Sequence, residues 1–169
     1  AGCSNTIIPG NILTIYEYAF EGINIESINI PASVTTIDER AIYNCALLGS
    51  ITVDEKNSVY DSRDNCNAII KTKTNELIVG CYNTVIPNGV KSIANYAFEE
   101  VGHLGDVIIP PSVTSIGDYA FKGSFLTGVY LPPSITSIGK YAFAWNSGIK
   151  EIVACMTTPP TIAETTFTS

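Results

Sequence analysis

One motif recurs along the chain and constrains the fold more than any other feature. In each copy, a short apolar segment ends in Ile-Pro or Leu-Pro. It is followed by an extended stretch similar to Val-Thr-Ser-Ile and then by a turn that contains aromatic residues. The prolines that mark the five copies are Pro9, Pro31, Pro87, Pro110 and Pro132. Neighbouring prolines lie 22 or 23 residues apart, except that 56 residues separate Pro31 from Pro87. Because one copy cannot bury its own apolar face, the copies must stack to close a core.

Each copy contains a short strand, a second extended segment and a compact turn. In Leu126–Leu131 the apolar residues take the first, fourth and sixth positions, and Pro132 ends the strand because proline cannot donate to a ladder. Residues 135–138 are expected to be extended, and Tyr141 to Phe143 to form a helical or 3-10 turn. This period is typical of leucine-rich repeats. We predict a leucine-rich-repeat solenoid with right-handed stacked coils, a parallel β-sheet on its concave face, and short turns or 3-10 segments elsewhere. Its strands should include 25–30, 48–53, 104–109, 126–131 and 149–154.

Stacking of the copies predicts three files of equivalent residues. The first two should be buried: Ile15, Ile37, Ile93, Ile116 and Ile138, and then Phe20, Ile42, Phe98, Phe121 and Phe143. The third holds hydroxyl side chains, and its repetition indicates a ladder that bonds the next coil or solvent rather than a set of nucleophiles: Thr14, Thr36, Ser92, Ser115 and Ser137.

The repeated string resembles a known family. The segment IPPSVTSIGDYAFKGSFLTGVYLPPSITSIGKYAF, residues 109–143, is similar to the BspA-like, or Treponema-type, leucine-rich repeats of bacterial surface proteins. The similarity extends over nearly the whole chain. Residues 54–85 resemble the longer repeat of that family, in which a hairpin is inserted. Here 68–70 and 77–79 would be its strands and 72–75 its turn. The resemblance implies surface display and adhesion.

The repeats make residues 1–169 a single domain, with 154–169 as a C-terminal cap in which Ile162 and Phe167 cover the last coil. At the other end, Ala1-Gly2-Cys3 allows a lipoprotein interpretation. However, residues 2–20 align with 80–98, so Cys3 corresponds to the internal Cys81, and we favour a structural role for it. The same alignment starts the chain inside a long repeat, so we expect it to be a fragment of a larger array.

Composition excludes several classes of partner. The net charge is −7, and the nine Lys and Arg residues are scattered. Binding to nucleic acid or anionic lipid requires clustered cations, so neither partner is expected. Apolar runs are too short for a membrane span, and we expect no direct membrane insertion. A surface rich in Ser, Thr, Asn and Gly with 15% charged residues is common outside the cell, which suggests a bacterial extracellular or cell-surface location.

Candidate metal and catalytic residues do not converge in the sequence. Five cysteines without short paired spacings and a single histidine give no zinc pattern, so no metal and no cofactor is expected. Asp61, Asp64 and Asn65 do not have the spacing of a calcium loop and are expected to form a turn. His103 lacks an oriented partner and is expected in a surface loop. We therefore expect no catalytic residues and no enzymatic activity.

A candidate binding face follows from the alternation of side chains along the strands. One outward column holds Ser27, Ser50, Asp106, Gly128 and Glu151, and the other holds Asn29, Thr52, Ile108, Tyr130 and Val153. The candidate contact residues on the concave face are Asp106, Ile108, Tyr130, Glu151 and Val153, together with Asn29 and Thr52. Aligned exposed apolar residues mark interaction sites, and Tyr is a frequent hot spot. The alternative is that Ile, Tyr and Val are isolated strand formers.

Two functions remain in view. The first is a non-catalytic, adhesion-type module, expected to be monomeric, that binds a protein or glycan of a host or a neighbouring cell. The second is a structural spacer that holds another domain away from the cell envelope. A hydrolase is the third class considered, and the lone histidine argues against it.

Overall fold

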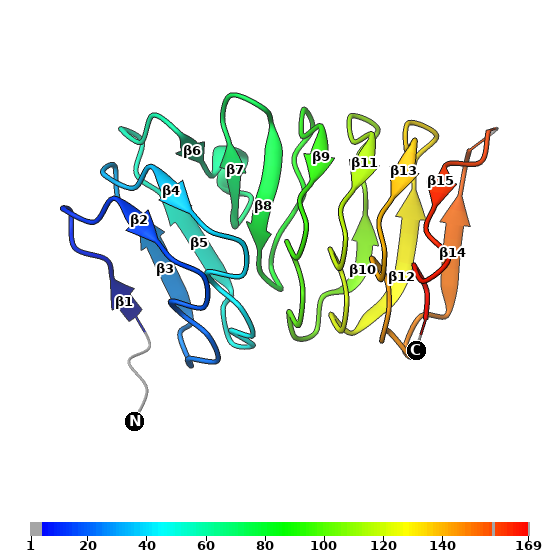
Figure 1. Cartoon of the computed structure of the whole chain (residues 1–169), viewed down its shortest axis with the longest axis horizontal. Coiled ribbons are helices and arrows are strands. Elements are labelled where there is room, and N and C mark those ends of the chain that lie inside the picture. The colour runs from blue at the N-terminus through cyan, green and yellow to red at the C-terminus, as the bar shows by residue number, and fades with distance from the viewer. Residues whose placement is uncertain (1–4, 157, 169) are drawn as a thin grey trace.

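The computed structural model describes residues 5–156 and 158–168, and it shows a solenoid of stacked coils (Figure 1). Each regular coil contributes one longer strand, which a proline or a polar turn ends, and one two-residue strand. The longer strands are β1 (Asn5–Ile7), β3 (Ser27–Ile30), β5 (Ser50–Val53), β10 (Gly105–Ile108), β12 (Leu126–Leu131) and β14 (Glu151–Ala154). The short strands are β2 (Thr14–Ile15), β4 (Thr36–Ile37), β9 (Ser92–Ile93), β11 (Ser115–Ile116), β13 (Ser137–Ile138) and β15 (Thr161–Ile162). Equivalent strands of neighbouring coils pair in parallel, which confirms the predicted solenoid.

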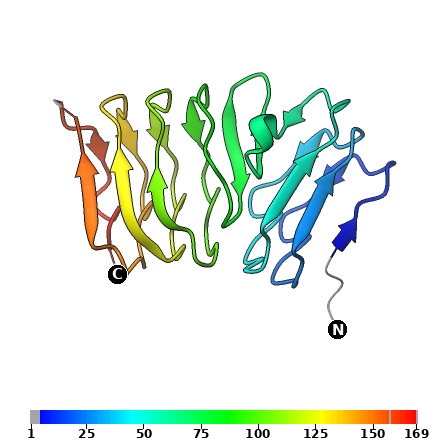
Figure 2. The ribbon, with the colours of Figure 1, turned by 180° about the vertical axis from the view of Figure 1, so that it is seen from behind.

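The longer strands do not form the single sheet that the sequence predicts. They form two three-stranded sheets, β1-β3-β5 and β10-β12-β14, here called the N-terminal and C-terminal sheets. Both lie on the same side of the solenoid and are seen from the front in Figure 2. The prediction of a single sheet is therefore wrong, and the inserted long repeat is the reason.

The long repeat contains β6 (Tyr60–Asp61), the 3-10 turn η1 (Arg63–Asn65), and an antiparallel hairpin of β7 (Ala68–Lys71) and β8 (Glu76–Gly80). The hairpin and the turn over Asp64 and Asn65 lie where they were predicted, whereas Asp61, expected in the same turn, ends strand β6. Successive side chains of β7 face opposite sides, and the register shift opposite Ile69 and Ile70 puts Leu77 and Val79 of β8 on opposite sides as well. Ile70 and Leu77 pack into the core of the C-terminal half, whereas Ile69 and Val79 pack into the core of the N-terminal half. The hairpin is thus a partition that is buried on both faces, and it divides the hydrophobic core in two.

On the opposite side of the solenoid, the hairpin joins the short strands. They form a seven-stranded sheet in the order β15-β13-β11-β9-β8-β7-β6, and β2 and β4 form a separate pair. The partition therefore continues the ladder of short strands in one direction, toward the C-terminus. Toward the N-terminus the ladder of short strands is interrupted, because β2 and β4 do not pair with the seven-stranded sheet. The ladder of longer strands is interrupted at the same place, between β5 and β10.

The predicted core files are largely confirmed. All five isoleucines of the first file are buried, as are Phe98, Phe121 and Phe143 of the second. Their rings stack with centroids 4.9 Å and 5.4 Å apart. Phe20 and Ile42 are only half-buried, contrary to the prediction. They pack against the smaller N-terminal core, where no phenylalanine stacks on them.

The C-terminal segment covers the last coil by repeating its motif. Thr161 and Ile162 pair with Ser137 and Ile138, and the Phe167 ring stacks on Phe143 with centroids 5.4 Å apart. This copy was not predicted from the sequence, because the period lengthens at Pro159. Ile162 and Phe167 remain 47% and 46% exposed, so this coil leaves an apolar outer side of its own.

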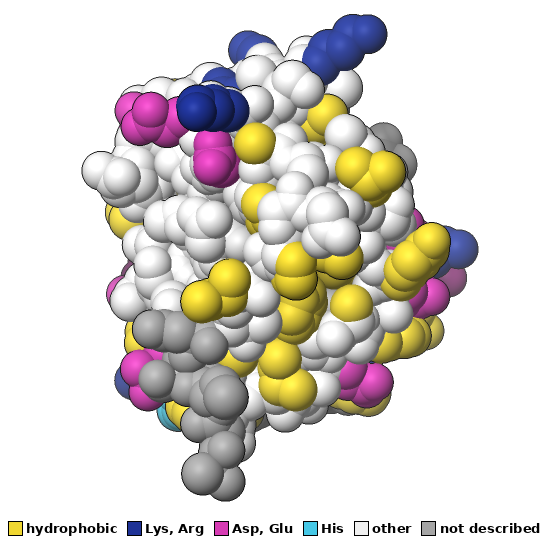
Figure 3. Space-filling model, turned by 90° about the vertical axis from the view of Figure 1, so that its left-hand side faces the viewer, with side chains coloured by type: hydrophobic (Ala, Val, Ile, Leu, Met, Phe, Trp, Pro, Cys, Tyr) yellow, Lys and Arg dark blue, Asp and Glu magenta, His cyan; other side chains and the backbone are white. Residues whose placement is uncertain are grey.

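The N-terminal coil also presents apolar side chains at the end of the solenoid (Figure 3). Ile7, Leu13 and Tyr16 are all well exposed there. Cys3, which the sequence analysis compared with Cys81, lies outside the described residues. Within residues 5–156 and 158–168, none of the structure is a helix long and apolar enough to cross a bilayer.

Candidate binding surface

Three of the predicted contact residues form one row across the C-terminal sheet. Ile108 is paired in register with Tyr130, and Tyr130 with Val153. On β10 and β12 the neighbouring Val107 and Val129 are buried, so alternation turns Ile108 and Tyr130 outward, whereas on β14 both Ile152 and Val153 are exposed. Ile108 is 73% exposed, Tyr130 38% and Val153 37%, which makes a continuous apolar stripe.

A second row, with acidic ends, runs parallel to the apolar one. Asp106 is in register with Gly128, and Gly128 with Glu151. Thr127 donates a hydrogen bond of 2.5 Å from its hydroxyl to Asp106 Oδ1 and holds that carboxylate in place. A Cβ atom at Gly128 would lie only 2.9 Å from the same oxygen, so the absence of a side chain keeps the middle of this row open.

The two rows line one shallow groove of about 510 Å³, here called the C-terminal face. The groove also includes Lys150. Lys150 was not predicted as a contact residue, because Glu151 is the outward position of that strand in the repeat. The neighbouring Cys155 thiol raises the pKa of Tyr130 above the ordinary 10.0 through a hydrogen bond. The Tyr130 hydroxyl can both donate and accept a hydrogen bond.

The other two predicted contact residues lie elsewhere. Asn29 and Thr52 are on the N-terminal sheet, where the Asn29 amide donates a hydrogen bond of 2.8 Å to the Thr52 hydroxyl. Thr52 lines a separate hollow beside β6, together with Asp61 and Arg63. The seven predicted residues thus lie on two sheets rather than on one, because the hairpin partition separates these sheets.

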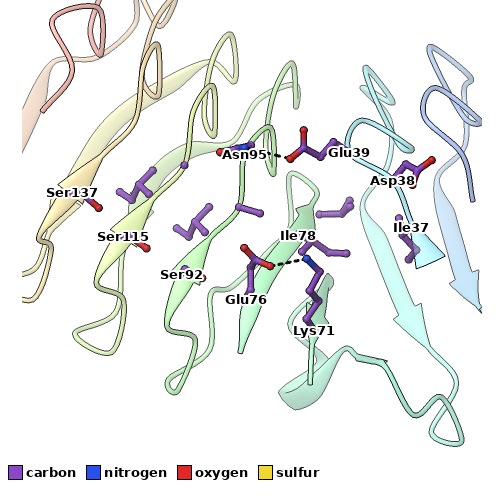
Figure 4. Close-up of a pocket in the computed structure, with 15 residues that line it drawn as sticks. Ile37, Asp38, Glu39, Lys71, Glu76, Ile78, Ser92, Asn95, Ser115 and Ser137 are labelled. Atoms are coloured by element: carbon purple, nitrogen blue, oxygen red, sulfur yellow. Dashed lines mark hydrogen bonds and ion pairs between the residues drawn. The ribbon is translucent and has the colours of Figure 1, made fainter. Parts of the chain in front are cut away.

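The opposite side of the solenoid has a polar groove of about 380 Å³ between β4 and β8 (Figure 4). Lys71 Nζ lies 2.8 Å from Glu76 Oε2, and the Asn95 amide donates to Glu39 at 3.3 Å. Ser92, Ser115 and Ser137 also line it, in register on adjacent strands. The groove has no hydroxyl activated by a neighbouring base in the described part of the chain, so its polar groups have the character of a solvated surface.

One buried ionic cluster escaped the sequence analysis. The Glu99 side chain is 1% exposed and accepts from Arg40 at 2.7 Å and from Lys122 at 3.1 Å. The Arg40 guanidinium also lies 4.0 Å from the centroid of the Tyr96 ring. Because Arg40 and Glu99 lie 59 residues apart, this cluster joins the coils on the two sides of the partition. We assign it to stability rather than to binding.

The described residues give little support to a catalytic or metal site. His103 is exposed, and its ring stacks on Phe125 with centroids 5.6 Å apart, as expected of a loop residue. Asp61 is held by Arg63 and Thr72: burial alone would raise its pKa, but their hydrogen bonds lower it overall. Across residues 5–156 and 158–168, no three His, Cys, Asp or Glu side chains are grouped so that they could hold a metal ion.

Comparisons with known proteins agree with this geometry. The family described as the BspA type leucine-rich repeat region matches residues 1–82 and 70–169, with six copies. A search of curated proteins gives no match.

Solved structures with the same fold include three bacterial proteins. A leucine-rich repeat protein from Eubacterium ventriosum is 27% identical, with a TM-score of 0.78 over 93% of this chain and 44% of its own. A leucine-rich cell surface protein from Faecalibacterium prausnitzii is 29% identical, with a TM-score of 0.64 over 85% of this chain and 45% of its own. The pneumococcal vaccine antigen PcpA, at 20% identity and a TM-score of 0.57, shares the fold over 85% of this chain and 31% of its own. This chain therefore spans less than half of each of these three proteins.

Proposed function

Since this chain belongs to the BspA-type leucine-rich repeat family, we propose that it is a non-catalytic binding module of a bacterial cell-surface or secreted protein. Its partner is a protein or glycan of a host or a neighbouring cell. The surface location is supported by the family and by the Faecalibacterium relative, which is described as a cell surface protein. The proposed contact region is the C-terminal face.

The observation that carries the proposal is the exposed row of Ile108, Tyr130 and Val153 beside the two carboxylates of Asp106 and Glu151. An aromatic centre within an apolar stripe and a polar border has the anatomy of a protein-binding hot spot. The carboxylates would favour a basic or hydrogen-bond-donating partner, chiefly through association rate and selectivity.

The test begins with binding of the purified chain to host-matrix proteins and to a glycan array. For any partner found, we expect Tyr130→Ala to weaken binding by about 2 kcal/mol or more, which is the hot-spot scale. Thr136→Ala is the matched control, because Thr136 is exposed near the short-strand sheet and donates only to the Thr114 carbonyl at 3.0 Å. Unchanged affinity in Tyr130→Ala, with a loss in Thr136→Ala, would move the site to the other side.

The spacer function remains the second candidate. It is favoured by the apolar side chains exposed on both end coils, since such coils are suited to stacking in a longer array. A purified chain that binds nothing on either panel would favour the spacer and argue against the binding module.

A further inference from the structure

The long-strand side of the solenoid has a gap next to β10. In the first coil, β1 pairs with β3 in parallel. The segment 83–85 corresponds to β1 in the repeat, yet it does not pair with β10. It is tied back to the long repeat instead: the Val85 amide donates to the Cys66 carbonyl at 3.1 Å, and the Thr84 hydroxyl donates to the Asn67 carbonyl at 2.6 Å. Among the described residues, β10 therefore has no strand paired with it on this side, and segment 84–88 is separated from it by a groove.

The edge of β10 that faces this gap has free peptide groups. The Ile109 amide donates to the Tyr130 carbonyl of β12 at 3.2 Å. Peptide groups alternate in direction along a strand, so those of Asp106 and Ile108 point away from β12 and into the gap. Among the described residues, none forms a hydrogen bond with the amide or carbonyl of either residue.

The facing edge of the N-terminal sheet is protected in a way that β10 is not. The Val53 amide donates to the Ser62 hydroxyl at 3.0 Å, and the Gly49 carbonyl accepts from the Asn83 amide at 3.2 Å. Side chains thus block the edge of β5, as proteins commonly do to prevent unwanted pairing. The edge of β10 has no such cover from the described part of the chain.

A groove of about 440 Å³ follows this open edge. Its walls include Val85, Ile108 and Tyr130, and the ring of Phe98 contributes to its lining. Val85 is 73% exposed although it lies in the interior of the solenoid's length. Asp106 is the single charged residue among those that line the groove.

We propose that β10 accepts an extended peptide segment of the partner as an additional strand. The inference rests on the proposed function, because the groove shares Asp106, Ile108 and Tyr130 with the C-terminal face. Alternating amides and carbonyls along an extended chain match the free groups of Asp106 and Ile108, whereas a glycan has no such alternation. Apolar side chains at alternate positions would enter the groove, and a Lys or Arg would pair with Asp106.

The first experiment measures amide hydrogen exchange of the free protein by NMR. The amides of Asp106 and Ile108 should exchange rapidly, whereas those of Val107 and Ile109 should be protected. Protection of all four amides at every protein concentration would mean that segment 83–86 itself pairs with β10, and the proposal would be overturned. Protection that increases with protein concentration would mean that a second copy fills the gap, which would also overturn it.

The second experiment adds a synthetic peptide of about eight residues, a common strand length, that alternates Val and Thr between terminal Arg residues. We expect binding by isothermal titration and new protection at Asp106 and Ile108. Two control peptides carry N-methyl groups on one or the other alternate set of amides. Methylation of the peptide amides that face β10 should weaken binding by at least about tenfold, because their hydrogen bonds are lost. Methylation of the other amides should leave the affinity unchanged.

Two variants at one position separate the backbone from the side chain. Ile108→Pro and Ile108→Thr both remove the exposed apolar side chain, but only proline removes the amide that points into the gap. Proline is tolerated at such edge positions, so the two variants should melt at similar temperatures. We expect Ile108→Pro to bind the peptide at least about tenfold more weakly than Ile108→Thr.

The failure of this inference can be distinguished from that of the proposed function. If a partner binds Tyr130→Ala more weakly but binds Ile108→Pro and Ile108→Thr with equal affinity, the proposed binding face is supported and strand addition is refuted. Absence of peptide binding would also refute it, and so would equal affinity for the two methylated controls.

Discussion

The phenylalanine file allows the stacking of coils to be tested at one residue. Phe121 is fully buried, and its ring is stacked between Phe98 at 4.9 Å and Phe143 at 5.4 Å. Phe121→Ala removes the ring from between two coils and opens a cavity that the stacked backbone cannot easily close. Phenylalanine-to-alanine changes in cores cost about 3–5 kcal/mol. Because two ring contacts of about 0.5–1.5 kcal/mol each are lost as well, we expect the upper part of that range.

Phe167→Ala is the matched control in the same file. Phe167 stacks on Phe143 alone and is 46% exposed, so its truncation should cost about 1 kcal/mol, near the scale of surface changes.

The assay is urea unfolding, followed by the fluorescence of the single tryptophan, Trp145. Its ring lies 4.2 Å from the Lys122 ammonium, in the C-terminal half that also contains Phe121. Circular dichroism should report on the whole chain, so separate transitions would show that the two cores unfold independently. A loss under about 1 kcal/mol for Phe121→Ala, or a loss equal to that of Phe167→Ala, would refute the stacking argument.

Three further predictions concern stability. Glu99→Gln should lower the free energy of unfolding by about 1–2 kcal/mol, because its charged hydrogen bonds with the partly exposed Arg40 and Lys122 are weakened. The control Glu164→Gln, at an exposed residue, should change the free energy of unfolding by less than about 0.5 kcal/mol in the same urea titration. Burial raises the pKa of Cys45 to about 11, above the roughly 8.5 of an unfolded thiol, so its contribution to stability is present below about pH 8.5 and is lost as the pH rises toward 11. Melting temperatures across that range should fall less steeply for Cys45→Ala than for the wild type, and identical slopes would contradict the assignment. Deletion of residues 156–169 should expose Phe143 and cause oligomerisation on size exclusion, and a truncated chain that stays monomeric with an unchanged melting temperature would show that the segment is not a cap.

The repeat made most of the architecture predictable from sequence. Strand positions and the isoleucine file follow from local periodicity, because a side chain repeated once per coil must occupy the same place in each coil. The hairpin at 68–80 interrupts that period, and only the resemblance to the longer repeat of the family implied it. The same periodicity placed Ile108, Tyr130 and Val153 in one outward row. The final coil was missed for the same reason, since its period is longer than that of the preceding copies.

Tertiary structure decided how the coils connect across the long repeat. Both faces of the β7–β8 hairpin are apolar, and only the assembled chain shows that each face packs into a different core. That partition splits the long-strand sheet, separates Asn29 and Thr52 from the C-terminal face, and leaves one edge of β10 without a neighbour. Periodicity reports which residues are equivalent from coil to coil. Whether two equivalent strands actually pair depends on competing hydrogen bonds such as that of Val85 to Cys66, and these are formed only when segments distant in the sequence meet in the folded chain.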